Sequence, residues 1–528
     1  MRAPDGSPVS SPVSSPVSSP VSVRARDYSW RHAGRSTPAV SGLTLDIEPG
    51  ERVLLLGASG AGKSTLLHAL AGVLGEGTGP DAAGEEHGSL TLDGIAPQLA
   101  RGRAGLVLQD PDSQLVLSRV GDEVAFGAEN LRIPPQEIWQ RVRTSLDDVG
   151  LRVPLHHSTA ALSGGQKQRL ALAGVLAMQP GLLLLDEPTA NLDPDGVEEV
   201  RAAVERVLER TGATLIVVEH RVSVWADVVD RVVVLAADGG ILADGPPSQV
   251  LSAPGNRARL TAAGVWLPGN RPAVPEPAAQ HAGSELLVAR GLAAGRGKRA
   301  PAIVSSVDLA LRAGTSLGIT GPNGAGKTTL ALTMGGLLKP VAGTLRATAA
   351  LAGSAGTDPG RWKSTELVTR IGTVFQEPEH QFLTGTVRGE LAFGPRRAGR
   401  LTETEIASLV DRLAERLRLT ALLDANPFTL SGGEKRRLSV ATMIATEPDI
   451  LLLDEPTFGQ DANTWAELVT LLRTLLAEGR SVVSVTHDAE FLAALGGNVL
   501  HVEDGTATVR TTAQKAALKM AGKEAARK

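Results

Sequence analysis

Two glycine-rich segments have the residue types and spacing of a phosphate-binding loop. In such a loop the glycines let backbone N–H groups turn toward a β-phosphate, and the helix that follows presents its positive end to the anion. We expect Lys63 and Lys327 to reach the β- and γ-phosphates of a nucleotide, and Ser64 and Thr328 to bind Mg²⁺. The expected phosphate-binding residues are Gly57, Ser59, Gly60, Gly62, Lys63, Ser64 and Thr65 in the first loop and Gly321, Asn323, Gly324, Gly326, Lys327, Thr328 and Thr329 in the second.

Short apolar runs predict buried parallel strands in both halves. The runs are 53–56, 182–185 and 215–218 in the first half, and 316–320, 450–453 and 482–485 in the second. In each half the first run enters the glycine loop, the second ends in Asp-Glu and the third is followed closely by a histidine. Because ligands of α/β proteins bind at the carboxyl ends of parallel strands, we expect this chemistry along one edge of each sheet.

The two acidic pairs suit phosphoryl chemistry. Asp186 and Asp454 end apolar strands, where a carboxylate is costly to bury unless it faces a cation or a hydrogen-bond donor. Mg²⁺ held through water supplies such a cation. The next residues, Glu187 and Glu455, are placed to orient and polarise the water that attacks a γ-phosphate.

The landmarks of the two halves recur in the same order. The position numbers of the loop lysines differ by 264 (327 − 63), and those of Gln109 and Gln376 differ by 267 (376 − 109). This nearly constant offset indicates internal duplication. At 528 residues the chain is also too long for one hydrophobic core and suits two domains.

Each half contains Leu-Ser-Gly-Gly ahead of a run with helical apolar spacing. Serine is a good N-cap, so on local grounds Ser163 and Ser431 predict helix starts. Since each segment also precedes an acidic strand, we interpret the pair as a second anion site. Its expected residues are Ser163, Gly164 and Gly165 in the first half and Ser431, Gly432 and Gly433 in the second.

The order of phosphate loop, glutamine, Leu-Ser-Gly-Gly, Asp-Glu and histidine resembles the ATPase subunits of ATP-binding cassette (ABC) proteins. The resemblance covers nearly everything outside the tails. It implies an α/β fold of two tandem P-loop NTPase domains, each with a mainly parallel sheet, an antiparallel β subdomain and a helical subdomain. It also implies ATP and Mg²⁺ as ligands, and two cassettes that pair head to tail within the chain, so that each phosphate loop faces the serine of the opposite half.

The resemblance further implies roles for single residues. The expected catalytic residues are Gln109, Glu187 and His220 in the first site and Gln376, Glu455 and His487 in the second. The expected Mg²⁺ ligands are Ser64, Gln109 and Asp186 in the first site and Thr328, Gln376 and Asp454 in the second.

Two departures from the family pattern bear on how the sites work. His32 aligns with the aromatic residue that stacks on adenine, with Trp30 and Tyr28 as close alternatives, whereas the second half offers no aromatic and leaves Arg296 as the candidate. The loops after the acidic pairs, 190–193 and 458–461, also differ. We therefore expect two competent sites that contribute unequally to hydrolysis.

A narrower resemblance follows the glutamines. The segments 109–114 and 376–381 read Gln-x-Pro-x-x-Gln, each with Ala-Phe-Gly downstream, and are similar to the ATPases of energy-coupling factor (ECF) importers, which take up vitamins and transition-metal ions. In that family this segment seats helices of a transmembrane subunit, so Gln114 and Gln381 are candidate contacts to a membrane partner. The implied partners are transmembrane transporter subunits and a membrane-embedded substrate-binding subunit, with the chain at the cytoplasmic face of the cell membrane as a peripheral protein.

Composition limits the kinds of partner and site that the chain can have. With 53 Lys and Arg against 57 Asp and Glu the formal charge is −4, and we expect no nucleic acid partner. The chain has no cysteine, which excludes disulfides and cysteine-based metal or redox sites. We expect a disordered Ser-Pro-Val-Ser tail over 1–22, cassettes over 23–260 and 285–510, a Pro/Ala-rich linker over 261–284 and a basic tail over 511–528.

The function expected from the sequence is therefore an ATP-hydrolysing subunit that energises an ECF-type importer. Two alternatives stay open: a soluble tandem ABC ATPase that acts on ribosomes as a translation factor, and the fused ATPase of a sugar importer. The short linker with few charges disfavours the ribosome-acting ATPase. The complete residue set of the second ATP site disfavours the sugar importer.

Overall fold

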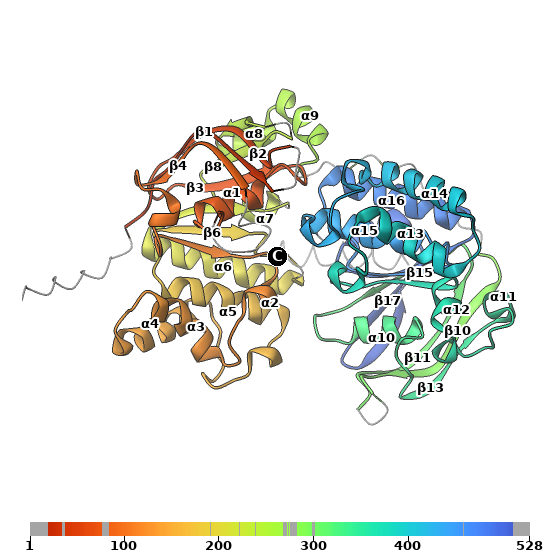
Figure 1. Cartoon of the computed structure of the whole chain (residues 1–528). Coiled ribbons are helices and arrows are strands. Elements are labelled where there is room, and N and C mark those ends of the chain that lie inside the picture. Colours follow the sequence, from red (N-terminus) through yellow and green to blue (C-terminus); the bar gives the residue numbers. More distant parts are fainter. Residues whose placement is uncertain are drawn as a thin grey trace, which may run out of the picture.

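The computed structural model describes residues 19–33, 37–75, 84–190, 192–220, 222–237, 239–267, 272, 274, 282–297, 301–457 and 459–510. Residues 1–18, part of the expected linker and the basic tail lie outside the described residues. Within them the chain forms two similar halves, cassette 1 and cassette 2, which lie side by side (Figure 1). None of the helices in the described part of the chain is long and apolar enough to span a lipid bilayer.

Cassette 1 contains a six-stranded sheet in the order β5-β6-β7-β3-β8-β9, which is parallel except for its last strand. An antiparallel sheet in the order β2-β1-β4 lies beside it. The strands are β1 (Val23–His32), β2 (Val40–Ile47), β3 (Arg52–Gly57), β4 (Gly84–Leu92), β5 (Ala104–Val107), β6 (Leu182–Asp186), β7 (Thr214–Val218), β8 (Arg231–Leu235) and β9 (Ile241–Gly245).

Cassette 2 repeats this arrangement with sheets in the orders β14-β15-β16-β12-β17-β18 and β11-β10-β13. Its strands are β10 (Glu285–Ala294), β11 (Val304–Arg312), β12 (Ser316–Thr320), β13 (Ala342–Ala347), β14 (Ile371–Val374), β15 (Ile450–Asp454), β16 (Ser481–Val485), β17 (Asn498–Glu503) and β18 (Thr506–Arg510). All six strands predicted from apolar runs are confirmed, as β3, β6, β7, β12, β15 and β16. The predicted fold class, two tandem α/β P-loop domains, is also confirmed.

Helices cover the parallel sheets and form a separate helical part in each cassette. Those of cassette 1 are α1 (Lys63–Leu70), α2 (Pro111–Gln114), α3 (Val120–Asn130), α4 (Pro135–Asp148), α5 (Gly164–Ala177), α6 (Pro194–Thr211), α7 (Val222–Trp225), α8 (Pro247–Ser252) and α9 (Pro254–Ala262). Those of cassette 2 are α10 (Lys327–Met334), α11 (Ala349–Ala352), α12 (Ser364–Val368), α13 (Val387–Ala398), α14 (Glu403–Arg416), α15 (Gly432–Ile444), α16 (Ala462–Ala477) and α17 (Ala489–Leu495).

The two cassettes point in opposite directions in Figure 1. Helices α3, α4 and α5 lie at the bottom of cassette 1, whereas α13, α14 and α15 lie at the top of cassette 2. The antiparallel sheets also lie at opposite ends, with β1, β2 and β4 at the top of cassette 1 and β10, β11 and β13 at the bottom of cassette 2. This inversion brings the sheet edge of one cassette toward the helical part of the other.

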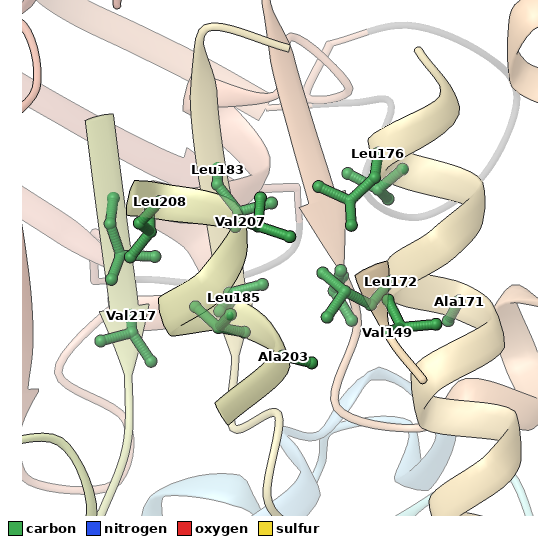
Figure 2. Close-up of a cluster of buried hydrophobic side chains, with 14 of the residues drawn as sticks. Val149, Ala171, Leu172, Leu176, Leu183, Leu185, Ala203, Val207, Leu208 and Val217 are labelled. Atoms are coloured by element: carbon green, nitrogen blue, oxygen red, sulfur yellow. The ribbon is translucent and has the colours of Figure 1, made fainter. Parts of the chain in front are cut away.

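The central strands are buried on both faces, as the continuous apolar runs predicted. Alternate residues of β6 belong to different cores: Leu183 and Leu185 pack among α5 and α6, while Leu182 and Leu184 pack toward the antiparallel sheet. Figure 2 shows part of the first of these cores, with Leu183 and Leu185 near Val207 of α6, and Leu172 and Leu176 on α5. Burial on both faces leaves only the strand ends for chemistry.

The packed part of cassette 1 begins before β1. Val21 is buried, its N–H donates to the carbonyl of Gly181 at 3.2 Å, and its own carbonyl accepts the Thr214 hydroxyl at 2.7 Å. The Ser22 N–H donates to Asp93 at 2.8 Å. Residues that composition assigned to the tail thus belong to the domain, because an apolar valine can close the end of the sheet.

Both antiparallel sheets contain a bulge opposite a glycine with positive φ. Gly88 (φ 78°) and Gly343 (φ 73°) lie where the register shifts. A Cβ at Gly88 would be 2.2 Å from the Asp27 carbonyl oxygen, and one at Gly343 would be 2.1 Å from the Gly291 carbonyl oxygen. Only glycine allows the two backbones to approach this closely.

We expect Gly343→Ala to destabilise cassette 2 by about 1–3 kcal/mol more than Gly356→Ala, because the new methyl group meets a backbone oxygen that cannot move away cheaply. Gly356 has a similar φ of 83°, and a Cβ there would meet nothing within 4 Å, so it isolates the backbone cost. Denaturant unfolding measures the difference. Equal losses for the two variants would contradict the steric explanation.

Candidate functional site

The phosphate loops join the ends of β3 and β12 to helices α1 and α10, which begin at Lys63 and Lys327. Gly62 (φ 83°) and Gly326 (φ 95°) are the N-caps of these helices and have left-handed backbones. A Cβ at Gly62 would lie 2.1 Å from the Ala39 carbonyl oxygen. The glycines are therefore required by the turn that aims the loop N–H groups and the helix start at one point.

The two loop lysines are buried and bend back across their loops. Lys63 Nζ donates to the carbonyls of Gly57 and Ala58, both at 2.9 Å. Lys327 Nζ makes the equivalent bonds to Gly321 and Pro322, both at 2.9 Å. Burial lowers the pKa of each lysine, while the acidic residues that follow β6 and β15 oppose that shift. The ammonium groups are thus placed where they can meet a triphosphate.

Asp186 and Asp454 lie beside the hydroxyl groups of the loops. Burial raises the pKa of Asp186 to about 6, and a hydrogen bond from Ser64 opposes the shift. Thr328 makes the same contact with Asp454, whose pKa burial also raises. Asp186 Oδ1 is buried and, among the described residues, has no hydrogen-bond partner. A buried carboxylate oxygen next to a loop hydroxyl fits a hard cation such as Mg²⁺, which accepts oxygen ligands and takes others from phosphates and water.

Glu187 and Glu455 have the same unusual backbone. Each has φ of 46°, in the left-handed region that non-glycine residues rarely adopt. Their N–H groups donate to the carbonyls of Val218 and Val485, both at 2.9 Å, so the neighbouring strands hold this conformation. Strain of this kind costs about 1–3 kcal/mol and persists where the surroundings fix it, most often at functional sites.

In cassette 1, Glu187 is held by two of the expected catalytic side chains. Gln109 Nε2 donates to Glu187 Oε2 at 2.7 Å, and His220 Nε2 is 2.9 Å from Glu187 Oε1. Burial opposes ionisation of this glutamate, but His220, Lys63 and Gln109 together lower its pKa. The structure thus brings together four residues that the sequence predicted to share a site.

Glu455 has different neighbours. Thr486 Oγ1 donates to Glu455 Oε2 at 3.0 Å, whereas His487 Nε2 is 3.9 Å from Glu455 Oε1 and 3.1 Å from Asn323 Oδ1. Burial, together with the nearby Asp454 carboxylate, raises the pKa of Glu455 to about 7. The backbone carbonyl of Gln376 accepts the guanidinium of Arg436. The same residue types therefore form two sites with different hydrogen bonds.

Cassette 2 forms one wall of the first site. The Ser59 N–H donates to Asp461 Oδ2 at 3.0 Å. A Cβ at Gly433 would be 3.5 Å from Ser59 Oγ, and one at Gly432 would be 3.2 Å from Gln109 Oε1. The expected facing of the first phosphate loop and the second Leu-Ser-Gly-Gly segment is therefore seen in these contacts.

The second site is contacted from cassette 1 through Asp193. The Asn323 N–H donates to Asp193 Oδ2 at 3.2 Å, which matches the bond between Ser59 and Asp461. A Cβ at Gly165 would approach only Leu192, at 3.7 Å, and one at Gly164 would meet nothing within 4 Å. The Leu-Ser-Gly-Gly segment of cassette 1 is thus less closely engaged than that of cassette 2.

Ser163 and Ser431 are N-caps of α5 and α15, as local sequence predicted. Each belongs to a capping box, with Gln166 in cassette 1 and Glu434 in cassette 2 returning a bond to the serine N–H at 3.0 and 2.8 Å. A capping serine accepts through its oxygen and keeps its hydroxyl proton to donate. The anion-binding role of both segments stays a prediction.

Of the three cassette 1 residues proposed to meet adenine, only His32 lies at the loop. His32 Nε2 is 3.3 Å from Thr65 Oγ1, beside the start of α1. Trp30 and Tyr28 are only 3% and 1% exposed, because they fill the core beneath the antiparallel sheet, so they are unsuitable as alternatives. Arg296, the candidate in cassette 2, is exposed just after β10.

Gln114 and Gln381, the candidate contacts to a membrane partner, are half-buried and bond to their own loops. Gln114 accepts from the Leu108 N–H at 2.9 Å and donates to the Leu106 carbonyl at 3.1 Å. Gln381 makes the equivalent bonds with Phe375 and Thr373, at 3.0 and 3.2 Å. Both amides close the loop that begins at Gln109 in cassette 1 or at Gln376 in cassette 2, so they stabilise these loops from within.

Sequence reasoning named the loops 190–193 and 458–461 but gave no contact to the aspartates that end them. The position numbers of Asp193 and Asp461 differ by 268 (461 − 193), and this recurrence was the signal that could have marked them as site residues. Glu219 is buried beside His220 and accepts from the Thr189 hydroxyl, while cassette 2 has Thr486 in its place. Arg436 donates to the Asp454 carbonyl at 3.3 Å, and burial lowers its pKa to about 10.

Comparison with known proteins gives the same division of the chain. A family model described as "ABC transporter" matches residues 40–190 and 304–458, which together are more than half of the sequence. The "Putative HMP/thiamine import ATP-binding protein YkoD" of Bacillus subtilis is 36% identical over 88% of this chain and 87% of its own length. A "Putative ABC transporter ATP-binding protein" of Streptomyces coelicolor is 33% identical over 92% of each chain.

Solved structures also share the tandem fold. An archaeal ribosome recycling factor, aABCE1, solved with the ribosomal stalk protein aP1, matches with a TM-score of 0.56 at 20% identity, covering 94% of this chain and 92% of that one. A structure named RNase-L Inhibitor matches with a TM-score of 0.54 at 19% identity, covering 91% and 89%. At these identities the similarity shows the fold alone.

Replacement of Glu187 and Glu455 by glutamine tests their expected role. We expect the double variant to lose steady-state ATPase activity by at least about 100-fold, because a neutral amide is a poor base for the attacking water. Each single variant should retain the activity of the other site, in unequal amounts. ATP binding, measured by filter retention, serves as the control and should be kept. Turnover of the double variant at the rate of the unmodified protein would exclude these glutamates as catalytic bases.

Proposed function

Because the chain belongs to the ABC transporter family, whose cassettes hydrolyse ATP, we propose that it energises an ECF-type importer for a vitamin or a transition-metal ion. The observation that supports this most directly is the first site, where residues of both cassettes meet. The name of the Bacillus subtilis relative, which refers to import of HMP or thiamine, agrees with a vitamin-type cargo. The cargo itself would be chosen by a membrane-embedded substrate-binding subunit.

Closure of the cassettes around nucleotide is the proposed working step. Ser59 and Asn323 lie in the phosphate loops and already bond to aspartates of the opposite cassette. A triphosphate bound by Lys63 would also meet the start of α15, where Ser431 can donate its hydroxyl. Nucleotide can drive closure only if it binds the closed state more tightly, and contacts from both cassettes provide that difference.

The proposed chemistry at the first site follows from the hydrogen bonds of Glu187. Its carboxylate, fixed by Gln109 and His220, would orient a water toward the γ-phosphate and accept its proton. Lys63 would neutralise the transferred phosphoryl group. Mg²⁺, held by Ser64 and Asp186 with Gln109 nearby, would supply charge neutralisation on the phosphates; Thr328, Gln376 and Asp454 are the counterparts in the second site.

Exposed apolar side chains in the segment that follows each catalytic glutamine suit a membrane-protein partner. In cassette 1, Val116 and Phe126 are 67% and 39% exposed, and in cassette 2, Leu383 and Phe393 are 67% and 37% exposed. The position numbers of both pairs differ by 267 (383 − 116 and 393 − 126), which is also the offset between Gln109 and Gln376. Recurrence of exposed large apolar residues at equivalent positions marks an interaction surface rather than scattered exposure.

The same surface is connected to the site through the backbone. Glu123 of α3 accepts from the N–H groups of Val116 and Leu117, at 3.0 and 2.6 Å, and Glu390 of α13 accepts from Leu383 at 2.5 Å. The loop that begins at Gln109 is therefore held at both ends, by Glu187 and by α3. Movement of a partner on this surface would be transmitted to the glutamine, and hydrolysis would be transmitted in the reverse direction.

We predict that Phe126→Ser and Phe393→Ser together reduce co-purification with membrane-protein partners at least about tenfold, since two central apolar contacts would be lost. ATPase activity of the isolated protein should stay within about twofold, because neither ring touches the sites. Quantitative mass spectrometry of the membrane fraction measures the effect. The matched control is Leu99→Ser, which removes another exposed apolar side chain (81% exposed) away from α3.

The same experiment distinguishes the importer function from that of a ribosome-acting tandem ATPase. Membrane partners that are lost in the double serine variant but kept in the Leu99 variant would support transport. Ribosomal RNA retained at moderate salt, with no membrane protein enriched, would overturn the importer proposal in favour of a ribosome-acting tandem ATPase.

A further inference from the structure

The segment that follows α9 leaves cassette 1 and lies against cassette 2. The Ala462 N–H donates to the Gly264 carbonyl at 2.9 Å, and Asn463 Nδ2 donates to the Ala262 carbonyl at 2.9 Å. Trp266 Nε1 donates to the Gln460 carbonyl at 3.1 Å. Three hydrogen bonds therefore hold this short segment, residues 262–267, on Gln460 and the first turn of α16.

The contact is close as well as polar. The rings of Trp266 and Trp465 meet edge to face, with centroids 5.4 Å apart and planes at 80°. Gly264 has φ of 77°, and a Cβ there would lie 3.0 Å from Asp461 Oδ1. Trp465 is itself buried and donates through Nε1 to Asp488 at 2.9 Å, so it offers a fixed surface. Edge-to-face pairs of this kind add to stability beyond the area they bury.

The loop that receives the segment is the one that completes the first site. Asp461 accepts from the Ser59 N–H. It is the residue directly after Gln460, whose carbonyl accepts from Trp266. A Cβ at Gly459 would be 3.0 Å from Gln109 Nε2 and 3.6 Å from Glu187 Oε2. Trp266, which belongs to the extension of cassette 1, thus holds a loop of cassette 2 against the first site of cassette 1.

We infer that Trp266 is a positioning residue for ATP hydrolysis in the first site. Its indole bonds to a main-chain carbonyl, which fixes the path of the 459–461 loop rather than one side chain. A loop that is already fixed loses less conformational entropy when nucleotide closes the site, so the closed arrangement forms more readily. Trp266 acts through Asp461 and Gly459 and does not itself reach the nucleotide. The inference rests on the proposed ATPase function of this site.

The inference predicts an effect on one site only. In a Glu455→Gln background, where the first site remains competent, Trp266→Ala should lower kcat/KM at least about fivefold, mainly through a higher KM for ATP, because the lost hydrogen bond served closure. In a Glu187→Gln background, where the second site remains competent, the same change should alter kcat/KM by less than about twofold. Equal losses in both backgrounds, or no loss in the first, would overturn the inference.

The matched pair Trp266→Phe and Trp362→Phe separates positioning from general stability. Each change removes one indole donor to a backbone carbonyl. Trp362 Nε1 donates to the Gly356 carbonyl at 2.7 Å, and this bond does not involve the 459–461 loop. Trp266→Phe should retain part of the ring contact and reproduce part of the rise in KM. Trp362→Phe should leave the KM of the first site unchanged.

Hydrogen exchange provides a readout that does not depend on turnover. In Trp266→Ala the Ser59 amide should exchange faster, although it is distant in sequence, because its acceptor Asp461 is less well placed. Amides of β15 should keep their protection. Faster exchange of β15 would show that cassette 2 had unfolded generally, and unchanged exchange of Ser59 would contradict the positioning role.

Discussion

The hydrogen bond from the Ser59 N–H to Asp461 sets how the two halves of the molecule meet. A phosphate loop must keep its N–H groups directed at one point, and this bond uses one of them to anchor the opposite cassette. The inverted arrangement of the cassettes in Figure 1 follows from the same requirement, because each sheet edge must face the helical part of the other half. The bond between Asn323 and Asp193 repeats the constraint at the second site.

The two sites differ in how their glutamates are held, although their residue types agree. In the first site Gln109 and His220 both reach Glu187, whereas in the second site Thr486 reaches Glu455 and His487 turns toward Asn323. One part of the difference lies in a neighbouring residue: Glu219 stands at the position of Thr486 and bonds to Thr189, whereas Thr486 bonds to Glu455. Unequal contributions to hydrolysis are the expected consequence of this difference.

Sequence predicted the features that depend on local pattern. Apolar runs located the central strands because parallel strands are buried on both faces, and glycine spacing located the loops because only glycine fits there. It did not predict the internal bonds of Gln114, since its side chain could reach either solvent or its own backbone and only the folded loop decides. It also left Trp30 as an alternative, because burial under the antiparallel sheet depends on distant residues. Trp266 lies in the segment between the repeats, so no internal comparison pointed to it.

Because the two cassettes are joined in one chain, the 459–461 loop always faces the first site and never the second. Gly459 faces Gln109 and Glu187 of one particular pocket, while the Asp193 loop faces the other. In a pair of identical separate subunits, any substitution in such a loop would appear in both pockets at once. In this fused chain a mutation in the loop changes one pocket alone. Each pocket can therefore diverge during evolution without a matching change in the other pocket.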